Sequence, residues 1–301
     1  MATSESERPT IIAKIVGGLG NQLFCYAAAR RMALLGGADL CLDTNFFRSD
    51  IYYAREYRLD QFPLPPHQIR HGRLVLPAIA DTYWWRIKRK IAATGIIPGA
   101  DFLIERDPHE FDTRLLSHKV TRNTFLDGYW QDERYFTDVA AQLRVDLGVV
   151  PNLNSEQREL AARMTSSNAV AIHTRRMQYA VPSSGHGSQT LTSSYYRRAL
   201  EVILDLIDSP EFFCFGDDPE WFGQWWPSTL PKTVVHHDDP MGEVLDLWFM
   251  TQCRHFIIAN STFSWWAAWL GTAPEKKVLA PKRQGLIYAI PSASGWIELD
   301  W

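Results

Sequence analysis

The sequence lacks a strong net charge, a long apolar run and a leader-like start. Its 301 residues carry 31 Lys and Arg against 34 Asp and Glu, a formal charge of −3 at pH 7, so nothing electrostatic predicts a nucleic-acid partner. No apolar stretch reaches the ~18 residues that a membrane-spanning helix needs. The polar, acidic start MATSESERPT has neither the basic residues nor the apolar core of a signal peptide. These absences predict a cytoplasmic protein.

The longest basic cluster runs from Arg86 to Lys90 within a helical pattern. Such a cluster is typical of a solvated helix face. Contact with an anionic membrane surface is the alternative, which leaves open a peripheral association with the inner face of a membrane.

Cysteine is scarce, and no two cysteines show CxxC spacing. The sequence therefore predicts neither a zinc knuckle nor a disulfide framework. Each cysteine lies in or beside an apolar segment, which favours buried free thiols. The four residues are Cys25, Cys41, Cys214 and Cys253.

Strand and helix patterns alternate at both ends of the chain, which predicts an α/β fold with parallel sheets. A Pro- and Asn-containing stretch, 148–155, interrupts the pattern and marks a domain join. We therefore expect two Rossmann-like domains, 1–150 and 151–301, with a cleft between them. The expected strands are 11–16, 38–43, 169–175, 211–218, 255–260 and 277–281, with a further strand and turn beginning at 125. The expected helices are 21–35, 78–94, 133–147, 193–207, 241–253 and 261–271.

A glycine-rich turn, Gly17, Gly18 and Gly20, joins the first strand to the first helix. Bare backbone N–H groups at a helix start attract an anion, usually phosphate. The spacing is neither G-x-G-x-x-G nor a Walker loop, and a tightly packed turn is the structural alternative. Asp43 ends the next strand, where a dinucleotide fold keeps its ribose-binding acid. An NAD-dependent oxidoreductase is therefore an alternative function.

His173, Arg175 and Arg176 come at the carboxyl end of the strand 169–175, the end where open α/β sheets bind ligands. A desolvated guanidinium is costly unless an anion pairs with it. Arg175 is thus a candidate phosphate clamp, and structural ion pairs are the alternative.

Asp217 and Asp218 end the strand 211–218 at the same edge. A metal site shared with 236–239 is conceivable, but no further acid follows at short spacing. Recognition of guanine by a carboxylate and capping of the next helix are the competing interpretations.

Asn260, Ser261 and Thr262 begin the helix 261–271. A cap explains one of these residues, and the additional hydroxyls suit a phosphate. Phe263 then packs the helix or covers the ligand. Together with the glycine turn, these segments fit a diphosphate held between two domains. A non-catalytic nucleotide- or glycan-binding protein fits the same pattern.

Six segments resemble the α-1,2-fucosyltransferases of glycosyltransferase family 11, over residues 14 to 299. They are GGLGNQLFCYAAARRMA, DGYWQDERYF, HTRR, SSYYRRAL after a GHG, FFCFGDDPEWF and IIANSTFSWWAAWLG. The resemblance implies a GT-B-type fold. It also implies metal-independent, inverting transfer of L-fucose from GDP-β-L-fucose to the 2-hydroxyl of a galactoside in a glycan, without a cofactor.

The resemblance also implies residue roles. Arg175 matches the arginine at the donor β-phosphate, and His173 matches a histidine near the nucleotide. Asp217 and Asp218 match an acidic pair proposed for guanine or ribose. The segments matching the diphosphate site and the opening loop are Asn260, Ser261, Thr262 and Phe263, and Gly17, Gly18, Gly20, Asn21 and Gln22.

The family's arginine motif usually continues to an aspartate, as HxRRxD, where this chain has Gln178. The catalytic base is therefore open, and His186 and Glu243 are the candidates. Late proton loss assisted by the departing phosphate is the alternative. The acceptor is expected on the N-terminal half, at Tyr129, Trp130 and Gln131, where ordinary packing is the competing explanation.

Overall fold

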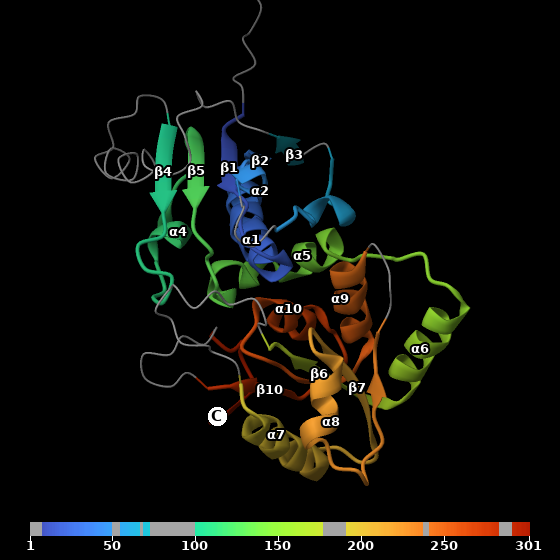
Figure 1. Cartoon of the computed structure of the whole chain (residues 1–301). Coiled ribbons are helices and arrows are strands. Elements are labelled where there is room, and N and C mark those ends of the chain that lie inside the picture. The colour runs from blue at the N-terminus through green and yellow to red at the C-terminus, as the bar shows by residue number, and fades with distance from the viewer. Residues whose placement is uncertain are drawn as a thin grey trace, which may run out of the picture. The chain divides into compact units, whose positions relative to one another are not determined.

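The computed structural model describes residues 8–49, 55–66, 69–72, 100–176, 191–236, 241–282 and 291–301. The chain divides into an N-terminal unit, Met1–Gly148, and a C-terminal unit, Val149–Trp301 (Figure 1). The helix expected at 78–94 and the basic cluster Arg86 to Lys90 lie outside the described residues, so membrane contact stays a prediction. Within the described ranges, none of the helices combines the length and apolar character needed to cross a bilayer.

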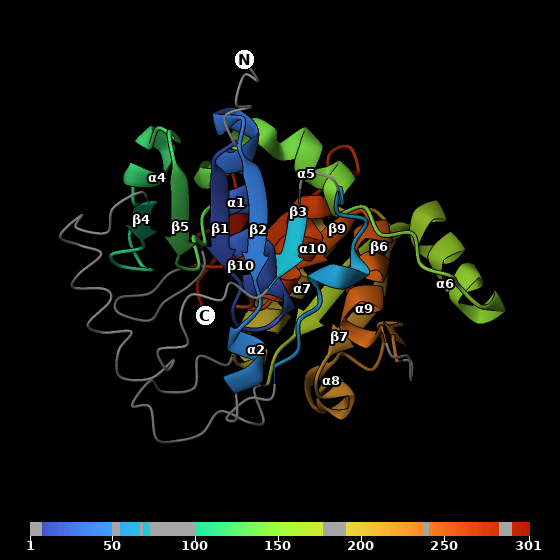
Figure 2. The same cartoon turned by 90° about the horizontal axis from the view of Figure 1, so that it is seen from above.

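The N-terminal unit is built on a five-stranded sheet in the order β3-β2-β1-β5-β4, which Figure 2 shows from above. Every neighbouring pair is parallel. The two edge strands, β3 and β4, were not expected from the sequence. The strands are β1 (Thr10–Lys14), β2 (Asp39–Asp43), β3 (Ile69–Gly72), β4 (Ala100–Ile104) and β5 (Asn123–Asp127).

The central helix of this unit, α1 (Leu19–Gly36), is buried on nearly all sides along its first four turns. Three consecutive alanines, 27–29, are fully buried and let neighbouring elements approach the helix on all sides. Gly37 ends the helix in the left-handed conformation (φ 59°), with its N–H donating to the Ala33 carbonyl.

The single helix predicted at 133–147 is wrong. Phe136 has φ −148° and ψ 8°, which interrupts the helix. The chain forms two 3₁₀ turns, Glu133–Tyr135 and Thr137–Val139, before α5 (Ala140–Asp146). The other short elements of the unit are α2 (Phe46–Ser49), a 3₁₀ turn Leu59–Gln61 and α4 (Arg114–Ser117).

A buried ionic network ties α1 to α5. Arg30 Nε and the Tyr26 hydroxyl both donate to Asp146 Oδ2, at 2.8 and 2.7 Å. Gln142 Nε2 donates to the other carboxylate oxygen at 2.8 Å. The Arg30 and Asp146 side chains are 4% and 2% exposed, so neither charge has water as a substitute partner.

Replacing Asp146 with alanine should lower the unfolding free energy by about 3–5 kcal/mol, because it removes the carboxylate that pairs with the buried Arg30 charge. Urea denaturation measures this change. Asp138→Ala is the matched control, since Asp138 pairs with Arg31 while 49% exposed, and it should cost about 1 kcal/mol or less. Equal losses in the two variants would contradict the assignment.

The C-terminal unit contains a six-stranded sheet in the order β11-β10-β9-β6-β7-β8, again with all neighbours parallel. Counted along the chain from β6, this is the order 3-2-1-4-5-6 of dinucleotide-binding folds. The edge strands β8 and β11 were not expected, so β10 is not the last strand. The strands are β6 (Asn168–Thr174), β7 (Pro210–Gly216), β8 (Thr233–Val234), β9 (His255–Ile257), β10 (Val278–Pro281) and β11 (Ile297–Leu299).

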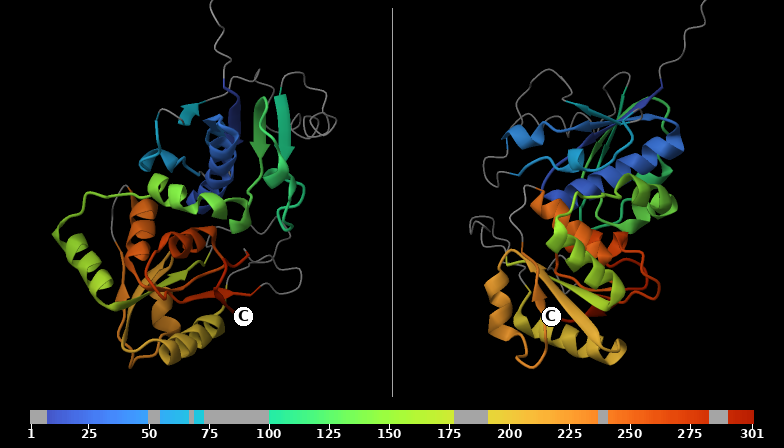
Figure 3. Two further views of the ribbon diagram at one scale, coloured as in Figure 1. Left: turned by 180° about the vertical axis from the view of Figure 1, so that it is seen from behind. Right: turned by 90° about the vertical axis from the view of Figure 1, so that its right-hand side faces the viewer.

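Helices cover both faces of this sheet. Residues of α7 (Ser193–Leu206) and α8 (Phe222–Trp225) share one apolar cluster with alternate residues of the strands, including Val170 and Ile172 of β6. On the other side lie α9 (Gly242–Gln252) and α10 (Thr262–Leu270) (Figures 1 and 3). The helix α6 (Ser155–Ser166) was not predicted, although Asn154 and Gln157 form a capping box at its start.

The predicted α/β fold with two Rossmann-like domains is confirmed, and the cleft between them stays a prediction. All four cysteines are free thiols. Three of them are buried as expected, and Cys41 is partly exposed.

Candidate functional site

The candidate site lies where β6 and β9 diverge in the C-terminal unit. From β6 the chain proceeds to β7 and β8 on one side, and then continues with β9 on the other side. Pairing between β6 and β9 ends at Ile172 and Ile257. The segments that follow these residues turn to different sides, which creates the crevice where such sheets bind ligands.

His173 and Phe263 meet at this point, one from the end of β6 and the other from the start of α10. Their ring centroids are 5.2 Å apart. His173 is 4% exposed, and its Nδ1 atom has no hydrogen-bond partner in the described part of the chain. Two residues that the sequence placed near the nucleotide are therefore neighbours.

The His173 imidazole is neutral. Burial, followed by the positive charge of Arg175, lowers its pKa from 6.5 to about 3. His173 can thus offer a neutral donor or acceptor to a ligand, but it supplies no positive charge.

Arg175 lies beside Asp217, with Nε 3.6 Å from the carboxylate Oδ2. This distance is longer than a hydrogen bond, and the Arg175 side chain stays one-third exposed. Within the described residues, no hydrogen bond engages its terminal Nη nitrogens. Asp217 also accepts the backbone N–H of Arg176 at 2.8 Å. The structural ion pair that the sequence left as an alternative is therefore present in a loose form.

Asp218 has the capping role. Its side chain accepts the Trp221 backbone N–H at 3.2 Å at the start of the 3₁₀ turn Pro219–Trp221. Contact of either acid with guanine or ribose stays a prediction.

The start of α10 is not capped by its own hydroxyls. Ser261 is the N-cap residue in extended conformation (φ −145°), and its side chain makes no capping hydrogen bond. The Ser261 hydroxyl therefore does not compete with an anion for the first-turn N–H groups of α10. Asn260, Ser261 and Thr262 are all partly exposed, as a binding segment requires.

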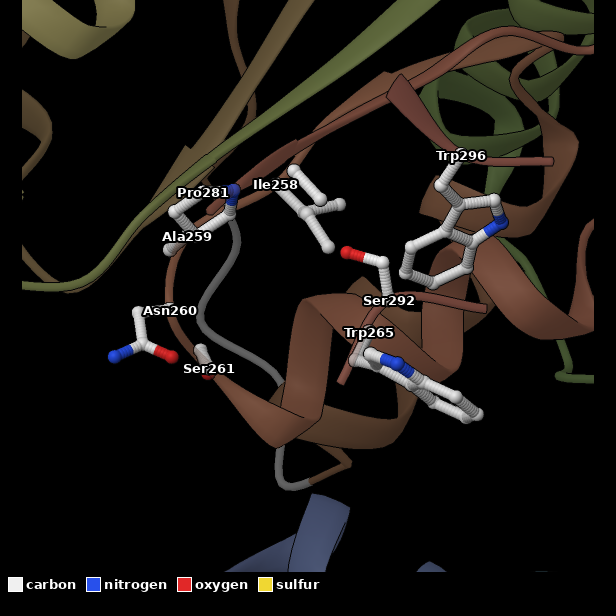
Figure 4. A pocket seen from close by; sticks show the side chains of 9 residues that line it. Ile258, Ala259, Asn260, Ser261, Trp265, Pro281, Ser292 and Trp296 are labelled. Carbon is white, nitrogen blue, oxygen red and sulfur yellow. The ribbon is translucent and has the colours of Figure 1, made fainter. Parts of the chain in front are cut away.

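A small cavity lies behind this segment (Figure 4). Its volume of about 10 Å³ has room for one water molecule and excludes a nucleotide. Ser292, Trp265 and Trp296 line one side of it, and Asn260 points away from the two tryptophans (Figure 4). Trp265 Nε1 donates to the Pro291 carbonyl at 2.9 Å, so the C-terminal segment supports the turn into α10.

Gly216 is a residue that the sequence analysis did not single out. It pairs with Thr174 across β7 and β6, and a Cβ atom at this position would lie 2.7 Å from the Thr174 carbonyl oxygen. A larger residue would push the end of β6 away and displace Arg175. The F-G-D-D sequence carried a signal, because a glycine that ends a strand often marks a close approach of two backbones.

A hollow of about 490 Å³ lies at the opposite, amino end of the same strands. It carries Arg254 and Lys277 together with Asp208 and Glu275. Its mixed charge favours no anion, and ligands of open α/β sheets bind at the carboxyl end. The site residues predicted in the C-terminal unit, such as His173, Asp217 and Asn260, lie at that carboxyl end.

In the N-terminal unit, the equivalent point lies between β1 and β5. Gly17 has φ 76°, and Gly18 precedes α1 without a side-chain cap, so the bare turn has the predicted form. Gln22 Nε2 donates to the Gly17 and Glu56 carbonyls at 3.0 and 2.8 Å, and its Oε1 accepts the Arg58 N–H at 2.9 Å. These bonds occupy both N–H donors of Gln22, so this residue shapes the loop.

Asn21 connects the glycine turn to the segment after β5, because Gln131 Nε2 donates to its Oδ1 at 2.9 Å. Within that segment, Tyr129 is exposed and Trp130 is fully buried. Trp130 packs edge-on against Tyr135 with ring centroids 5.4 Å apart. The prediction that Trp130 contacts a sugar is wrong, since it belongs to the core.

Glu105 was also missed. Its carboxylate is buried and accepts the backbone N–H groups of Tyr129 and Trp130 at 2.8 and 3.0 Å. Burial raises the pKa of Glu105, while these two hydrogen bonds act in the opposite direction. The bonds hold a segment in which Trp130 has a positive φ of 55°.

The two candidate bases remain predictions. Glu243 is an exposed residue in the first turn of α9. The helix dipole by itself favours an acidic residue at this position. His186 and Gln178 lie outside the described residues, as do three of the four residues at 236–239. Among the residues that the structure describes, no group of three or more His, Cys, Asp or Glu side chains could hold a metal ion.

The family model described as Glycosyl transferase family 11 matches residues 101–284, and the chain belongs to this family. An α-1,2-colitosyltransferase from Escherichia coli is 25% identical over 96% of this chain and 99% of its own length. A galactoside α-(1,2)-fucosyltransferase 1 from Lagothrix lagotricha is 24% identical over 48% of this chain and 42% of its own length.

The fold has solved counterparts. A crystal structure of the α-1,6-fucosyltransferase NodZ soaked with GDP-fucose aligns with a TM-score of 0.52 at 16% identity, over 90% of this chain and 94% of that one. NodZ comes from Bradyrhizobium. The family expected from the sequence is confirmed, and the protein is a glycosyltransferase.

The buried His173 should make stability depend on pH. Because its pKa falls from 6.5 to about 3 on folding, only the unfolded chain binds the proton between these values. The unfolding free energy should therefore drop as pH falls below 6.5, by at most about 1.4 kcal/mol per pH unit from this group. His173→Gln should reduce that slope in urea denaturation at a series of pH values. An unchanged slope in His173→Gln would refute the assignment.

Proposed function

We propose that the protein is an inverting α-1,2-fucosyltransferase that moves L-fucose from GDP-β-L-fucose to the 2-hydroxyl of a galactoside in a glycan. The observation that supports this is the convergence of His173, Arg175 and the segment Asn260–Phe263 at the crevice between β6 and β9. A neutral imidazole, a guanidinium and an uncapped helix start are the groups that a nucleoside diphosphate requires. In this proposal the C-terminal unit binds the donor and the N-terminal unit binds the acceptor.

Stabilisation of the leaving group is the main task of the proposed site. The acceptor oxygen attacks C1 of fucose, the bond from C1 to the β-phosphate oxygen breaks, and GDP leaves with the electron pair. Arg175 and the first-turn N–H groups of α10 would meet the charge that develops on the β-phosphate. One such donor is commonly worth about 3–4 kcal/mol. This arrangement needs no metal ion, because the guanidinium and the helix start supply the positive potential.

The acceptor proton has two proposed routes. Glu243 or His186 takes it as a base, or it passes late in the reaction to the departing phosphate. On the acceptor side, the exposed Tyr129 offers a ring face to a sugar. Gln131, two residues further along the chain, and Asn21 are polar groups that share a hydrogen bond.

Binding and turnover together test the proposed function. GDP at about 100 times its dissociation constant should stabilise the protein by about 2.7 kcal/mol in a thermal-shift assay, and NAD should not. GDP-fucose with galactosides should then release GDP, with and without EDTA. Stabilisation by NAD alone would favour the oxidoreductase, and GDP binding without turnover on a broad acceptor panel would favour the binding protein.

The name of the colitosyltransferase relative defines the competing donor. A nucleotide-activated colitose should be tested beside GDP-fucose at equal concentration. A higher kcat/KM for the colitose donor would overturn the assignment of fucose without affecting the transferase class.

Arg175→Ala should lower kcat by about 100- to 1000-fold with the fold intact, because it removes a donor to the developing charge. Arg175→Lys should recover part of the loss, since a lysine restores the charge without the fork of donors. Arg254→Ala is the matched control, because Arg254 is an exposed arginine of the same unit that bonds Asn168 at the amino end of β6. Full activity in Arg175→Ala would refute the phosphate role.

A further inference from the structure

Two adjacent tyrosines of α7 reach the ends of both strands at the crevice. The Tyr196 hydroxyl donates to the His173 carbonyl at 3.2 Å. The Tyr195 hydroxyl donates to the Ile258 carbonyl at 2.8 Å and approaches the Leu279 carbonyl of β10 at 3.3 Å. Both tyrosines are at least 98% buried, with exposures of 1% and 2%.

The two carbonyls occupy a defined place in the sheet. The last pair that joins β6 to β9 is Ile172 with Ile257, so His173 is the next residue of β6 and Ile258 is the residue directly after β9. Buried carbonyls need hydrogen-bond donors, and here the donors are the hydroxyls of two α7 side chains. These hydrogen bonds therefore lie at the point where β6 and β9 separate.

Aromatic neighbours surround the two tyrosine rings. Tyr195 and Tyr196 pack edge-on with ring centroids 5.0 Å apart. The ring centroid of Tyr196 lies 5.5 Å from that of Trp221 and 5.3 Å from that of Trp225. Trp221 in turn carries the Arg176 guanidinium, 4.3 Å from its ring centroid. Burial raises the pKa of both tyrosines, so the hydroxyls remain protonated donors at working pH.

We infer that Tyr195 and Tyr196 are positioning residues that fix the ends of β6 and β9 in the geometry that receives the donor diphosphate. Tyr196 holds the residue two positions before Arg175, and Tyr195 holds the residue two positions before Asn260. This inference rests on the proposed function, because it assigns the donor to this crevice. The tyrosines lie on the face of the sheet that α7 and α8 cover. In this inference they do not contact the substrate.

Tyr195→Phe, Tyr196→Phe and the double variant test the inference by removing only the hydroxyls. Each single variant should raise the dissociation constant for GDP and the donor KM by up to about fivefold, the worth of one net hydrogen bond. The double variant should raise both further. The acceptor KM should stay within about twofold, because the proposed acceptor site lies on the N-terminal unit.

Tyr26→Phe is the matched control, because Tyr26 is an equally buried tyrosine whose hydroxyl bonds Asp146 in the other unit. It should lower stability and leave GDP affinity unchanged. In the ligand-free protein, amide hydrogen exchange over 257–263 should be faster in the double variant than in this control.

Wild-type GDP affinity or wild-type exchange in the double variant would overturn the inference. The single variants keep the test decisive if the double variant does not fold. Failure of the wild-type protein to bind GDP would overturn the proposed function instead. The hydrogen-exchange measurement would then still show whether the tyrosine hydroxyls hold the strand ends.

Discussion

The divergence of β6 and β9 beyond Ile172 and Ile257 is the constraint on which the rest of the site depends. Parallel strands that stop pairing leave backbone groups and side chains without the partners that a continuous sheet supplies. Here that edge receives an arginine, a neutral histidine and the start of a helix. Asp217 lies near Arg175 without forming a hydrogen bond to it, so the guanidinium is oriented and keeps its affinity for an anion. A closer ion pair with Asp217 would have neutralised the Arg175 charge that the proposed chemistry needs for the phosphate.

Different groups organise the same topological point in the two units. In the N-terminal unit, hydrogen bonds of Gln22, Asn21 and Glu105 organise the glycine turn and the segment after β5, where the Trp130 Nε1 atom is buried without a hydrogen-bond partner among the described residues. In the C-terminal unit, the Nδ1 atom of His173 and the Oγ1 atom of Thr174 are buried without such a partner. Each of these atoms needs an explanation, and a water or ligand that completes its hydrogen bonds is one. The proposed placement of the anionic donor on the C-terminal unit therefore rests on Arg175, which supplies the positive charge.

Most of the long helices and the central strands could be predicted from the sequence, with α6 as an exception, whereas the strands at the edges of both sheets could not. The four missed strands, β3, β4, β8 and β11, all lie at an edge, where one side of the strand is unpaired and the apolar pattern is weak. Arg175, His173 and Phe263 could be brought together in advance because strand ends share one edge of a parallel sheet. Trp130, Glu105 and Tyr195 could not be placed, because their roles depend on partners brought close by folding. Glu105 and Tyr195 bond to residues 24 and 63 positions away.

A crystal structure of the protein with GDP is the most direct test of where the diphosphate binds. We predict the β-phosphate at the first turn of α10, within hydrogen-bond distance of the Arg175 guanidinium and beside the His173 ring. A diphosphate bound elsewhere, with Arg175 still facing Asp217 and the crevice between β6 and β9 empty, would contradict this placement.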